Sequence, residues 1–380
     1  MKNSPVIAVL GGGNGAFATA ADLTLRGFAV RLFELPALAE NIRGAKERGG
    51  IELTIVGRPG LKPGFARIEV ITSDIRKALD GAQIVLAVVP AFAQRAFAEA
   101  AAPHLRPEQL VVLTPGNFGG SLEFAHILEK AGIRRRPLLA DMECMIYSGF
   151  KSSPSSVEVS GYKLGIMLAA YPGIRSAEAH GRLQAVYPEI RAARNILEIG
   201  LSNINTILHA PIAVLNAGRI ENTAGQFLFY WQGVTPAVAR VLEGVDREKM
   251  ELGRRLGITL FPLAEILRRF YSHLGLKGED LHRMVSTNPV YEIDWAPKGL
   301  EHRFLLEDIP FGMVPMETLG RLAGVPTPLT TAVINLAGEM LRTDLRARAR
   351  DLEGLGLRGL SVSKILELVN QGSIGQGGGD

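Results

Sequence analysis

The stretch from Val6 to Glu34 constrains the fold of this chain more than any other part of the sequence. It begins with a short apolar run, Val6 to Leu10, of the β-branched kind that forms strands covered on both faces. A glycine-rich turn follows at once, then a segment with helical spacing of apolar residues, then a second strand that ends in an acid. This order predicts a βαβ unit, the building block of a parallel sheet covered by helices.

The turn has the pattern G-x-G-x-x-A, and each small residue has a physical reason. Gly11 permits the tight turn, Gly13 lets the backbone approach a pyrophosphate, and Ala16 lets the helix pack closely on the strand. The helix N-terminus would face the anion with free N–H groups. A glycine turn in another kind of α/β domain is the alternative. The predicted dinucleotide-binding residues are Gly11, Gly13, Asn14, Gly15, Ala16 and Glu34.

Glu34 decides the expected choice of cofactor. It closes the second strand about twenty residues after the turn, where a carboxylate can accept both ribose hydroxyls and repel a 2′-phosphate. Leu35 and Pro36 offer no arginine to receive such a phosphate. We therefore expect NAD, and NADP stays open because Arg43 could fold back toward the site.

Further apolar strands follow with helices between them, at Gln83–Val89, Leu110–Leu113 and Pro137–Ala140. Residues 51–56 and 67–71 are expected to form a hairpin. From Asp141 the pattern changes: DMECMIYSGF is interpreted as a loop, and the sequence after it predicts two more strands instead of crossover units. Helical segments then dominate.

The predicted fold class is α/β, with an N-terminal Rossmann dinucleotide-binding domain followed by a mostly α-helical substrate domain. The boundary is expected near Asn195, which gives a first domain of residues 1–194 and a second of 195–370. The longest amphipathic pattern in the second domain, 235–256, has Thr235 as its N-cap and Gly257 at its end. Residues 371–380 are glycine-rich and are expected to be a disordered tail.

Composition excludes several classes of function. A net charge of +4 over 380 residues gives no reason to expect a nucleic-acid partner. The sequence has no apolar stretch long enough for a membrane span, no signal-peptide pattern, and no His, Cys or acidic residues at metal-ligand spacing. The single cysteine, Cys144, fits a reducing compartment. We expect a cytoplasmic protein without a metal.

Two stretches of the second domain place polar groups within apolar sequence, which is costly unless those groups are bonded or used. The first, Asn203 to Thr223, contains His209. A lone histidine of this kind is more often a bonded core residue than a catalyst. The second, Glu301 to Pro315, contains Arg303 and Asp308.

The residue types in the second stretch allow two interpretations. Arg303 could clamp a substrate carboxylate, and Asp308 could orient an imidazole and stabilise its protonated form. Alternatively, Arg303 forms a surface ion pair with Glu301, Glu307 or Asp308. The residues alone favour the ion pair slightly.

The chain resembles the opine dehydrogenase family, which comprises the octopine and nopaline dehydrogenases and bacterial relatives that act on N-(carboxyalkyl)amino acids. The resemblance runs over nearly the whole chain, through GGGNGA, VVPAFAQRAFAEAAAPHL, TPGNFGG, His209-Ala-Pro with Asn-Ala-Gly-Arg, and RFLLEDIPFGMVP. It implies an active site between a nicotinamide-binding domain and a helical domain. It also implies reversible, NAD(P)H-dependent reductive condensation of an amino acid's amine with a 2-oxo acid.

The resemblance also implies roles for three residues. His209 matches the family's catalytic histidine, and Asp308 matches the aspartate paired with it. Arg303 falls where octopine enzymes place an arginine that holds a substrate carboxylate. His209 would then act as general acid in reduction and as base in reverse. The expected partners are these two small-molecule substrates, and a homodimer is left open.

The chain departs from the family pattern near the predicted amine site. Ile146-Tyr147 stands where relatives often have Pro-Tyr, and Lys151 stands about where an arginine is common. Cys144 lies near the loop that contacts the amino substrate in octopine enzymes. Asp294 and Trp295 offer a second acid and aromatic, although an ordinary loop is the preferred interpretation there.

Two other functions remain as alternative hypotheses. The first is a 2-oxo acid or 3-hydroxyacid reductase of the ketopantoate reductase type, a class that usually relies on a lysine in the helical half. Lys249 and Lys277 lie in polar sequence and are expected to be exposed, which disfavours this class. The second is a non-catalytic NAD(H) sensor, which would not need His209, Arg303 and Asp308.

Overall fold

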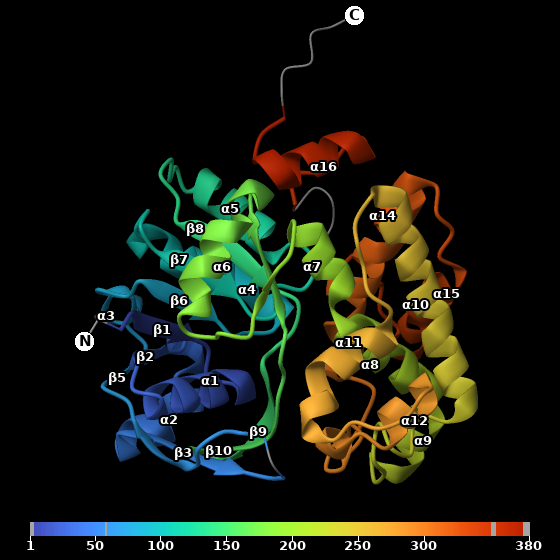
Figure 1. The fold of residues 1–380 in the computed structure, drawn as a ribbon, viewed down its shortest axis with the longest axis horizontal. Coiled ribbons are helices and arrows are strands. Elements are labelled where there is room, and N and C mark those ends of the chain that lie inside the picture. The colour runs from blue at the N-terminus through green and yellow to red at the C-terminus, as the bar shows by residue number, and fades with distance from the viewer. Residues whose placement is uncertain (1–3, 58, 351–354, 375–380) are drawn as a thin grey trace, which may run out of the picture.

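The computed structural model describes residues 4–57, 59–350 and 355–374. Figure 1 shows two lobes side by side: a blue-to-green N-terminal lobe that contains the strands, and a yellow-to-orange lobe built from helices. The predicted fold class, a Rossmann-type α/β domain followed by a mostly helical domain, is confirmed.

The main sheet of the first lobe has eight strands, and the apolar runs predicted from the sequence form its centre. Neighbouring strands are parallel except β11 and β8, which are antiparallel. In spatial order the strands are β12 (Arg191–Ala192), β11 (Met167–Tyr171), β8 (Leu138–Met142), β7 (Leu110–Leu113), β6 (Ile84–Ala87), β1 (Val6–Leu10), β2 (Ala29–Phe33) and β5 (Val70–Thr72).

A second sheet of four strands lies beside helix α1. A hairpin does form from β3 and β4, but its second strand was predicted wrongly: it is Gly64–Arg67 instead of residues 67–71, and residues 70–72 pair with β2 as β5. The segment interpreted as a loop after Asp141 was predicted wrongly in its second half, because Tyr147–Ser153 pairs antiparallel with β10. In spatial order the strands are β4 (Gly64–Arg67), β3 (Gly50–Ile55), β10 (Ser156–Tyr162) and β9 (Tyr147–Ser153).

Six α-helices accompany these strands within the described part of the first lobe, with short 3₁₀ turns between some of them. They are α1 (Asn14–Leu25), α2 (Glu40–Arg48), α3 (Ile75–Leu79), α4 (Gln94–Ala101), α5 (Gly120–Lys130) and α6 (Ser176–Gln184). The 3₁₀ turns are η1 (Pro36–Leu38), η2 (Ala91–Ala93), η3 (Ala102–His104) and η4 (Gly173–Arg175).

The described residues of the second lobe form helices joined by loops, with one isolated bridge between Leu228 and Trp295. Its α-helices are α7 (Ile196–Ser202), α8 (Ile204–Leu215), α9 (Ala217–Thr223), α10 (Pro236–Leu256), α11 (Leu263–Tyr271), α12 (Leu281–Ser286), α13 (Arg303–Leu306), α14 (Val314–Ala323) and α15 (Pro328–Leu341). Shorter turns are η5 (Ser272–Leu274), η6 (Pro289–Tyr291) and the π-helix η7 (Ile309–Met313).

The caps of α10 explain why its bounds could be predicted. The Thr235 side chain accepts a hydrogen bond from the Val238 N–H, and Gly257 ends the helix in the left-handed conformation. Helix α8 has no such amphipathic signature, because nearly all of its residues are buried and Pro211 lies inside it. It forms the centre of the second lobe.

The C-terminal helix α16 (Val362–Gln371) packs on the first lobe, not on the helical one. Figure 1 shows it in red beside α5. It contacts η4, and the Asn195 Nδ2 donates a hydrogen bond to Asn370 Oδ1 at 2.8 Å. The division into residues 1–194 and 195–370 stays a prediction. Of the predicted tail, 371–380, Gln371 ends α16 and residues 375–380 lie outside the described residues.

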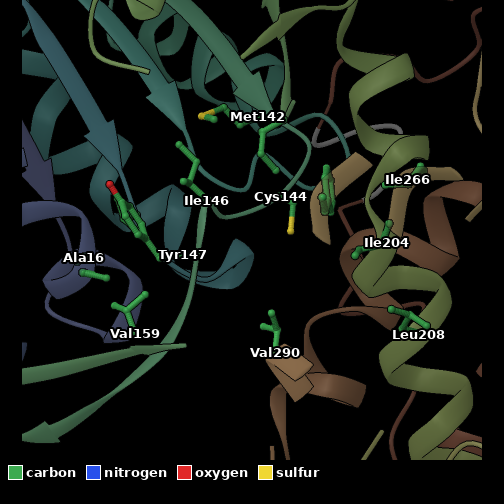
Figure 2. Packing of buried hydrophobic residues seen from close by; sticks show 14 of the residues in the cluster. Ala16, Met142, Cys144, Ile146, Tyr147, Val159, Ile204, Leu208, Ile266 and Val290 are labelled. Atoms are coloured by element: carbon green, nitrogen blue, oxygen red, sulfur yellow. The ribbon is translucent and has the colours of Figure 1, made fainter. Parts of the chain in front are cut away.

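One buried apolar cluster runs through both lobes. Figure 2 shows Ala16 and Tyr147 on the side of the first lobe and Ile204 and Leu208 on helix α8, with Cys144 between them. Because apolar side chains from both lobes share this cluster, separating the lobes would expose surface that the hydrophobic effect keeps buried. The lobes therefore meet at a packed junction that fixes the side chains described below.

Candidate active site

The glycine turn has the geometry that the sequence predicted. Gly11 has a φ of +122°, and a Cβ there would collide with the Val88 carbonyl oxygen, so only glycine fits. Gly13 is the N-cap of α1, has no side chain to satisfy the first turn, and faces open space. The amide groups that begin α1 are thus positioned for an anion. This observation fits the pyrophosphate of a dinucleotide.

Glu34 lies against this turn in a buried position. It is 3% exposed and accepts hydrogen bonds from the Leu35 N–H at 2.8 Å and from Asn41 Nδ2 at 3.1 Å. A Cβ on Gly12 would lie 2.8 Å from Glu34 Oε2, which shows how closely the carboxylate approaches the turn. Asn41 was not predicted. Arg43, which kept NADP open, pairs instead with Glu40 at 2.7 Å on the surface.

Lys151 reaches over the same turn from β9. Its Nζ donates to the carbonyl oxygens of Asn41 and Gly12, at 2.6 and 3.2 Å, and its backbone N–H donates to Asn14 Oδ1 at 3.0 Å. Partial burial lowers the pKa of Lys151, while the nearby Glu34 carboxylate raises it. Lys151, which differs from the arginine common in the family, therefore lies beside the cofactor turn and not beside His209.

The structure brings His209 and Asp308 together across 99 residues of sequence. His209 Nδ1 lies 2.7 Å from Asp308 Oδ2, and the two residues are 7% and 2% exposed. Gly312 makes this approach possible, because a Cβ there would collide with Thr206, one turn before His209 on α8. Pro310 and Gly312 do prevent a simple α-helix, since Ile309–Met313 forms a π-helix.

Tyr230 contacts the other ring nitrogen and was not predicted from the sequence. His209 Nε2 lies 2.8 Å from the Tyr230 hydroxyl. Burial holds the pKa of Tyr230 well above its ordinary value, so its hydroxyl stays protonated. If Asp308 accepts from Nδ1–H, the tautomer leaves Nε2 to accept from Tyr230. The signal that could have found Tyr230 is the dense aromatic run from Phe227 to Trp231.

Aromatic rings enclose the imidazole. Phe304 stacks on His209 with ring centroids 4.1 Å apart, and Phe229 meets the imidazole edge-on at 6.5 Å. Tyr291 stacks on Tyr230 at 4.0 Å. These rings limit the motion of the imidazole and exclude water from it, which strengthens its hydrogen bonds.

Arg303 lies next to this group but pairs with Glu307, as the ion-pair interpretation allowed. Its Nε donates to Glu307 Oε2 at 2.9 Å, and within the described chain its two Nη atoms have no hydrogen-bond partner. The pair is not a simple surface bridge, because Glu307 is buried. Glu307 Oε1 accepts from the Ala91 N–H at 3.0 Å and from Asn117 Nδ2 at 3.4 Å, both in the first lobe.

Lys249 and Lys277 were both predicted to be exposed, which is wrong for Lys249 and confirmed for Lys277. Lys249 is 1% exposed, because its Nζ pairs with Asp246 at 2.6 Å and donates to the Phe261 carbonyl at 2.7 Å. Salt bridging within α10 lets the helix bury this charge. Lys277 is exposed. Since the Lys249 ammonium is already bonded inside the lobe, neither lysine has the setting of a catalytic group.

Neither Cys144 nor a cluster of metal ligands adds a reactive group to this site within the described residues. Cys144 is a buried free thiol, and burial raises its pKa. No group of three His, Cys, Asp or Glu residues in the described ranges could hold a metal ion. None of the helices in the described part of the chain combines the length and apolar character that a membrane span needs.

Comparison with known proteins places this geometry in a family. The chain is 34% identical to the opine dehydrogenase of Arthrobacter sp. (strain 1C) over 369 residues, which cover 97% of this chain and 100% of that protein. The chain belongs to the opine dehydrogenase family. Residues 192–341 also match the family model described as "NAD/NADP octopine/nopaline dehydrogenase, alpha-helical domain".

Solved structures of this and related families agree with the fold. Octopine dehydrogenase, solved with NADH and L-arginine, superposes with a TM-score of 0.76 at 25% identity, covering 96% of this chain and 98% of that one. A ketopantoate reductase from Ralstonia eutropha JMP134 reaches a TM-score of 0.56 at 17% identity, over 88% and 99% of the two chains. The second likeness concerns the fold alone, so family membership rests on the opine dehydrogenases.

Proposed function

We infer that this chain catalyses the NAD(H)-dependent reductive condensation of an amino acid with a 2-oxo acid, reversibly, as an oxidoreductase acting on a CH–NH group. The amine and the oxo carbonyl join with loss of water, and one hydride and one proton are added across the resulting C=N bond. The product is a secondary amine with two carboxylates. The observation that carries this inference is the buried Asp308–His209–Tyr230 chain in a member of the opine dehydrogenase family.

NAD(H), when bound, supplies the hydride. The residues that fit it are those around the glycine turn: the amide groups that begin α1 would hold the pyrophosphate, and Glu34 would accept from the ribose hydroxyls. The proposed binding residues are Gly11, Gly13, Asn14, Gly15, Ala16 and Glu34. NAD is favoured over NADP because the buried Glu34 carboxylate would repel a 2′-phosphate.

His209 is the proposed general acid and base. Asp308 accepts a hydrogen bond from Nδ1–H, which fixes the tautomer and stabilises the imidazolium that forms when Nε2 takes a proton. The protonated Nε2 would give its proton to the hydroxyl that leaves as the imine forms. In the reverse reaction the neutral Nε2 would remove a proton. The Tyr230 hydroxyl orients the imidazole through its hydrogen bond to Nε2. A substrate atom would replace this hydroxyl during the reaction.

Arg303 is the proposed site for the carboxylate of the 2-oxo acid. Its Nη atoms have no partner among the described residues, and its charge interacts with Asp308 and Tyr230, the two residues that contact His209. Glu307 holds the guanidinium in place through its bond to Nε. Holding the oxo acid in this way would convert much of the binding free energy into rate by proximity.

A cytoplasmic location and a homodimer are also proposed. The single free cysteine fits a reducing compartment, and light scattering of the purified chain would measure the oligomeric state.

A matrix of L-amino acids and 2-oxo acids, with amine-free controls, tests the function. NADH oxidation is expected only when both substrates are present. Turnover of an oxo acid that does not depend on an amine would instead support the ketopantoate reductase type. NADH binding without turnover of any pair would support the sensor.

A further inference from the structure

Asp294 is held rigidly beside the proposed catalytic group. Its backbone carbonyl accepts a hydrogen bond from the Phe229 N–H at 2.8 Å, and its own N–H donates to Tyr291 at 3.3 Å. The neighbouring Leu228 and Trp295 form an isolated β-bridge. Because Tyr230 follows Phe229 and contacts His209, this backbone pairing fixes the Asp294 backbone near the imidazole.

The carboxylate of Asp294 has no hydrogen-bond donor among the described residues, although it is partly buried. An acid in this setting loses solvation without gaining a bond, which is unfavourable unless a ligand supplies the donor. The two neighbouring acids differ from Asp294 in this respect, because Asp308 is hydrogen-bonded to His209 and Glu307 to Arg303. Asp294 is the acid of this group that is left available to a ligand.

The groups facing Asp294 define the charge that it can accept. Lys163, from the first lobe, and His209 both lower the pKa of Asp294, while Tyr230 and Tyr291 are neutral. Lys163 does not form an ion pair with Asp294 within 4.0 Å, because its Nζ donates to the Met145 carbonyl and to Ser148 Oγ. Burial raises the pKa of Asp294 to about 6, so the carboxylate is ionised at neutral pH.

We propose that Asp294 binds the reacting ammonium group of the amino acid substrate and holds it beside His209. The proposal rests on the proposed function, because it assigns one end of the amino acid to a residue of the same site. A carboxylate is an acceptor only, so it selects a donor with positive charge. Its place next to His209 indicates the α-ammonium, the nitrogen on which the condensation occurs, and not a cation at the far end of a side chain.

The test is Asp294→Asn, with Glu292→Gln as the matched control because Glu292 is exposed two residues away on the same segment. The probes are L-alanine, L-leucine, L-phenylalanine and L-arginine, each with pyruvate. We expect the KM for each amino acid to rise about 10- to 100-fold in Asp294→Asn, the loss typical of one charge-assisted hydrogen bond. The KM for pyruvate and the NADH affinity, measured by fluorescence titration, should change less than about twofold.

Three outcomes overturn the proposal. The first is an unchanged amino acid KM in Asp294→Asn, and the second is an equal rise in KM in Glu292→Gln. The third is a rise in KM for L-arginine alone, which would place the contact at the cation of its side chain.

Calorimetry of amino acid binding to the enzyme–NADH complex separates this proposal from the proposed function. If the unmodified enzyme oxidises NADH with no amine and oxo acid pair, the function fails, yet calorimetry still measures the effect of Asp294. Weaker amino acid binding to Asp294→Asn supports the proposal, and unchanged or undetectable binding by both proteins contradicts it. Asp294→Glu retains the charge and should recover part of the lost affinity.

Discussion

The glycine turn of the first lobe and the imidazole site of the second lobe are built in opposite ways. The turn uses backbone groups within residues 11–16, plus one carboxylate that closes the adjacent strand. The imidazole site uses side chains from positions 209 to 308, which helix packing brings together. A binding site for a common cofactor can thus be local in sequence, whereas the site that selects the reaction depends on the tertiary fold.

The largest effect is expected at the centre of the imidazole site. His209→Ala removes the group that moves the proton, so kcat should fall about 10²- to 10⁴-fold. NADH affinity, measured by fluorescence titration, should stay within about twofold, because the cofactor contacts lie in the first lobe. A similar fall in NADH affinity would show that the two sites are not separate.

Asp308→Asn should have the next largest effect. The amide cannot stabilise an imidazolium by charge, so we expect kcat to fall about 10- to 100-fold, as for the loss of a hydrogen bond to a charged group. The measurement is a kcat profile against pH, with Glu301→Gln on the exposed surface as the control. If Asp308→Asn kept the kcat of the wild type, the hydrogen bond between Asp308 and His209 would have no role in catalysis.

The cofactor site is tested by Glu34→Gln. The variant keeps the size of the side chain but removes the charge that excludes a 2′-phosphate, so NADH affinity should fall about 10-fold and the preference over NADPH should narrow. Glu40→Gln, which affects only a surface ion pair, is the control. An unchanged ratio of NADH to NADPH affinity would contradict the role of Glu34.

A smaller effect is expected for Tyr230→Phe. It removes one neutral hydrogen bond to His209 Nε2 and keeps the ring stack with Tyr291, so kcat should fall about 2- to 10-fold. The experiment compares kcat and KM at several pH values. A loss as large as that of His209→Ala would mean that Tyr230 itself transfers the proton.

The smallest effect concerns stability. Folding raises the pKa of Asp294 from 3.8 to about 6, so the native state binds more protons than the unfolded state between these values. This group therefore destabilises the fold progressively as the pH rises from about 4 to 6, and the penalty stays constant above. Asp294→Asn should be more stable than the unmodified chain by about 1 kcal/mol at pH 7, allowing for solvent screening, and no more stable at pH 4. Urea unfolding at the two pH values measures this difference, and equal stabilities at pH 7 would contradict it.

More of the first lobe than of the second could be predicted from the sequence. The turn at Gly11, the apolar strands and the caps of α10 are encoded by neighbouring residues, so local patterns were sufficient to predict them. Strand β9 was missed because its partner, β10, pairs with it outside the main sheet. The burial of Lys249 was missed because a charged residue gives no local sign of a buried ion pair.

In the candidate site, too, contacts that depend on the tertiary fold could not be predicted from the sequence. Resemblance to a family singled out His209 and Asp308, and the structure places them in contact. Tyr230 and Asp294 could not be assigned, because their positions depend on how Phe229 pairs with the segment after η6. The ion pair of Arg303 with Glu307 was foreseen as one of several, but its burial between lobes depends on the fold.

The most direct measurement is mass spectrometry of the product formed from NADH deuterated at the transferred C4 position, an ¹⁵N-labelled amino acid and pyruvate. We expect a secondary amine that contains the ¹⁵N atom and one deuterium on the carbon that was the pyruvate carbonyl carbon. Deuterated lactate, with the labelled amino acid recovered unchanged, would contradict it.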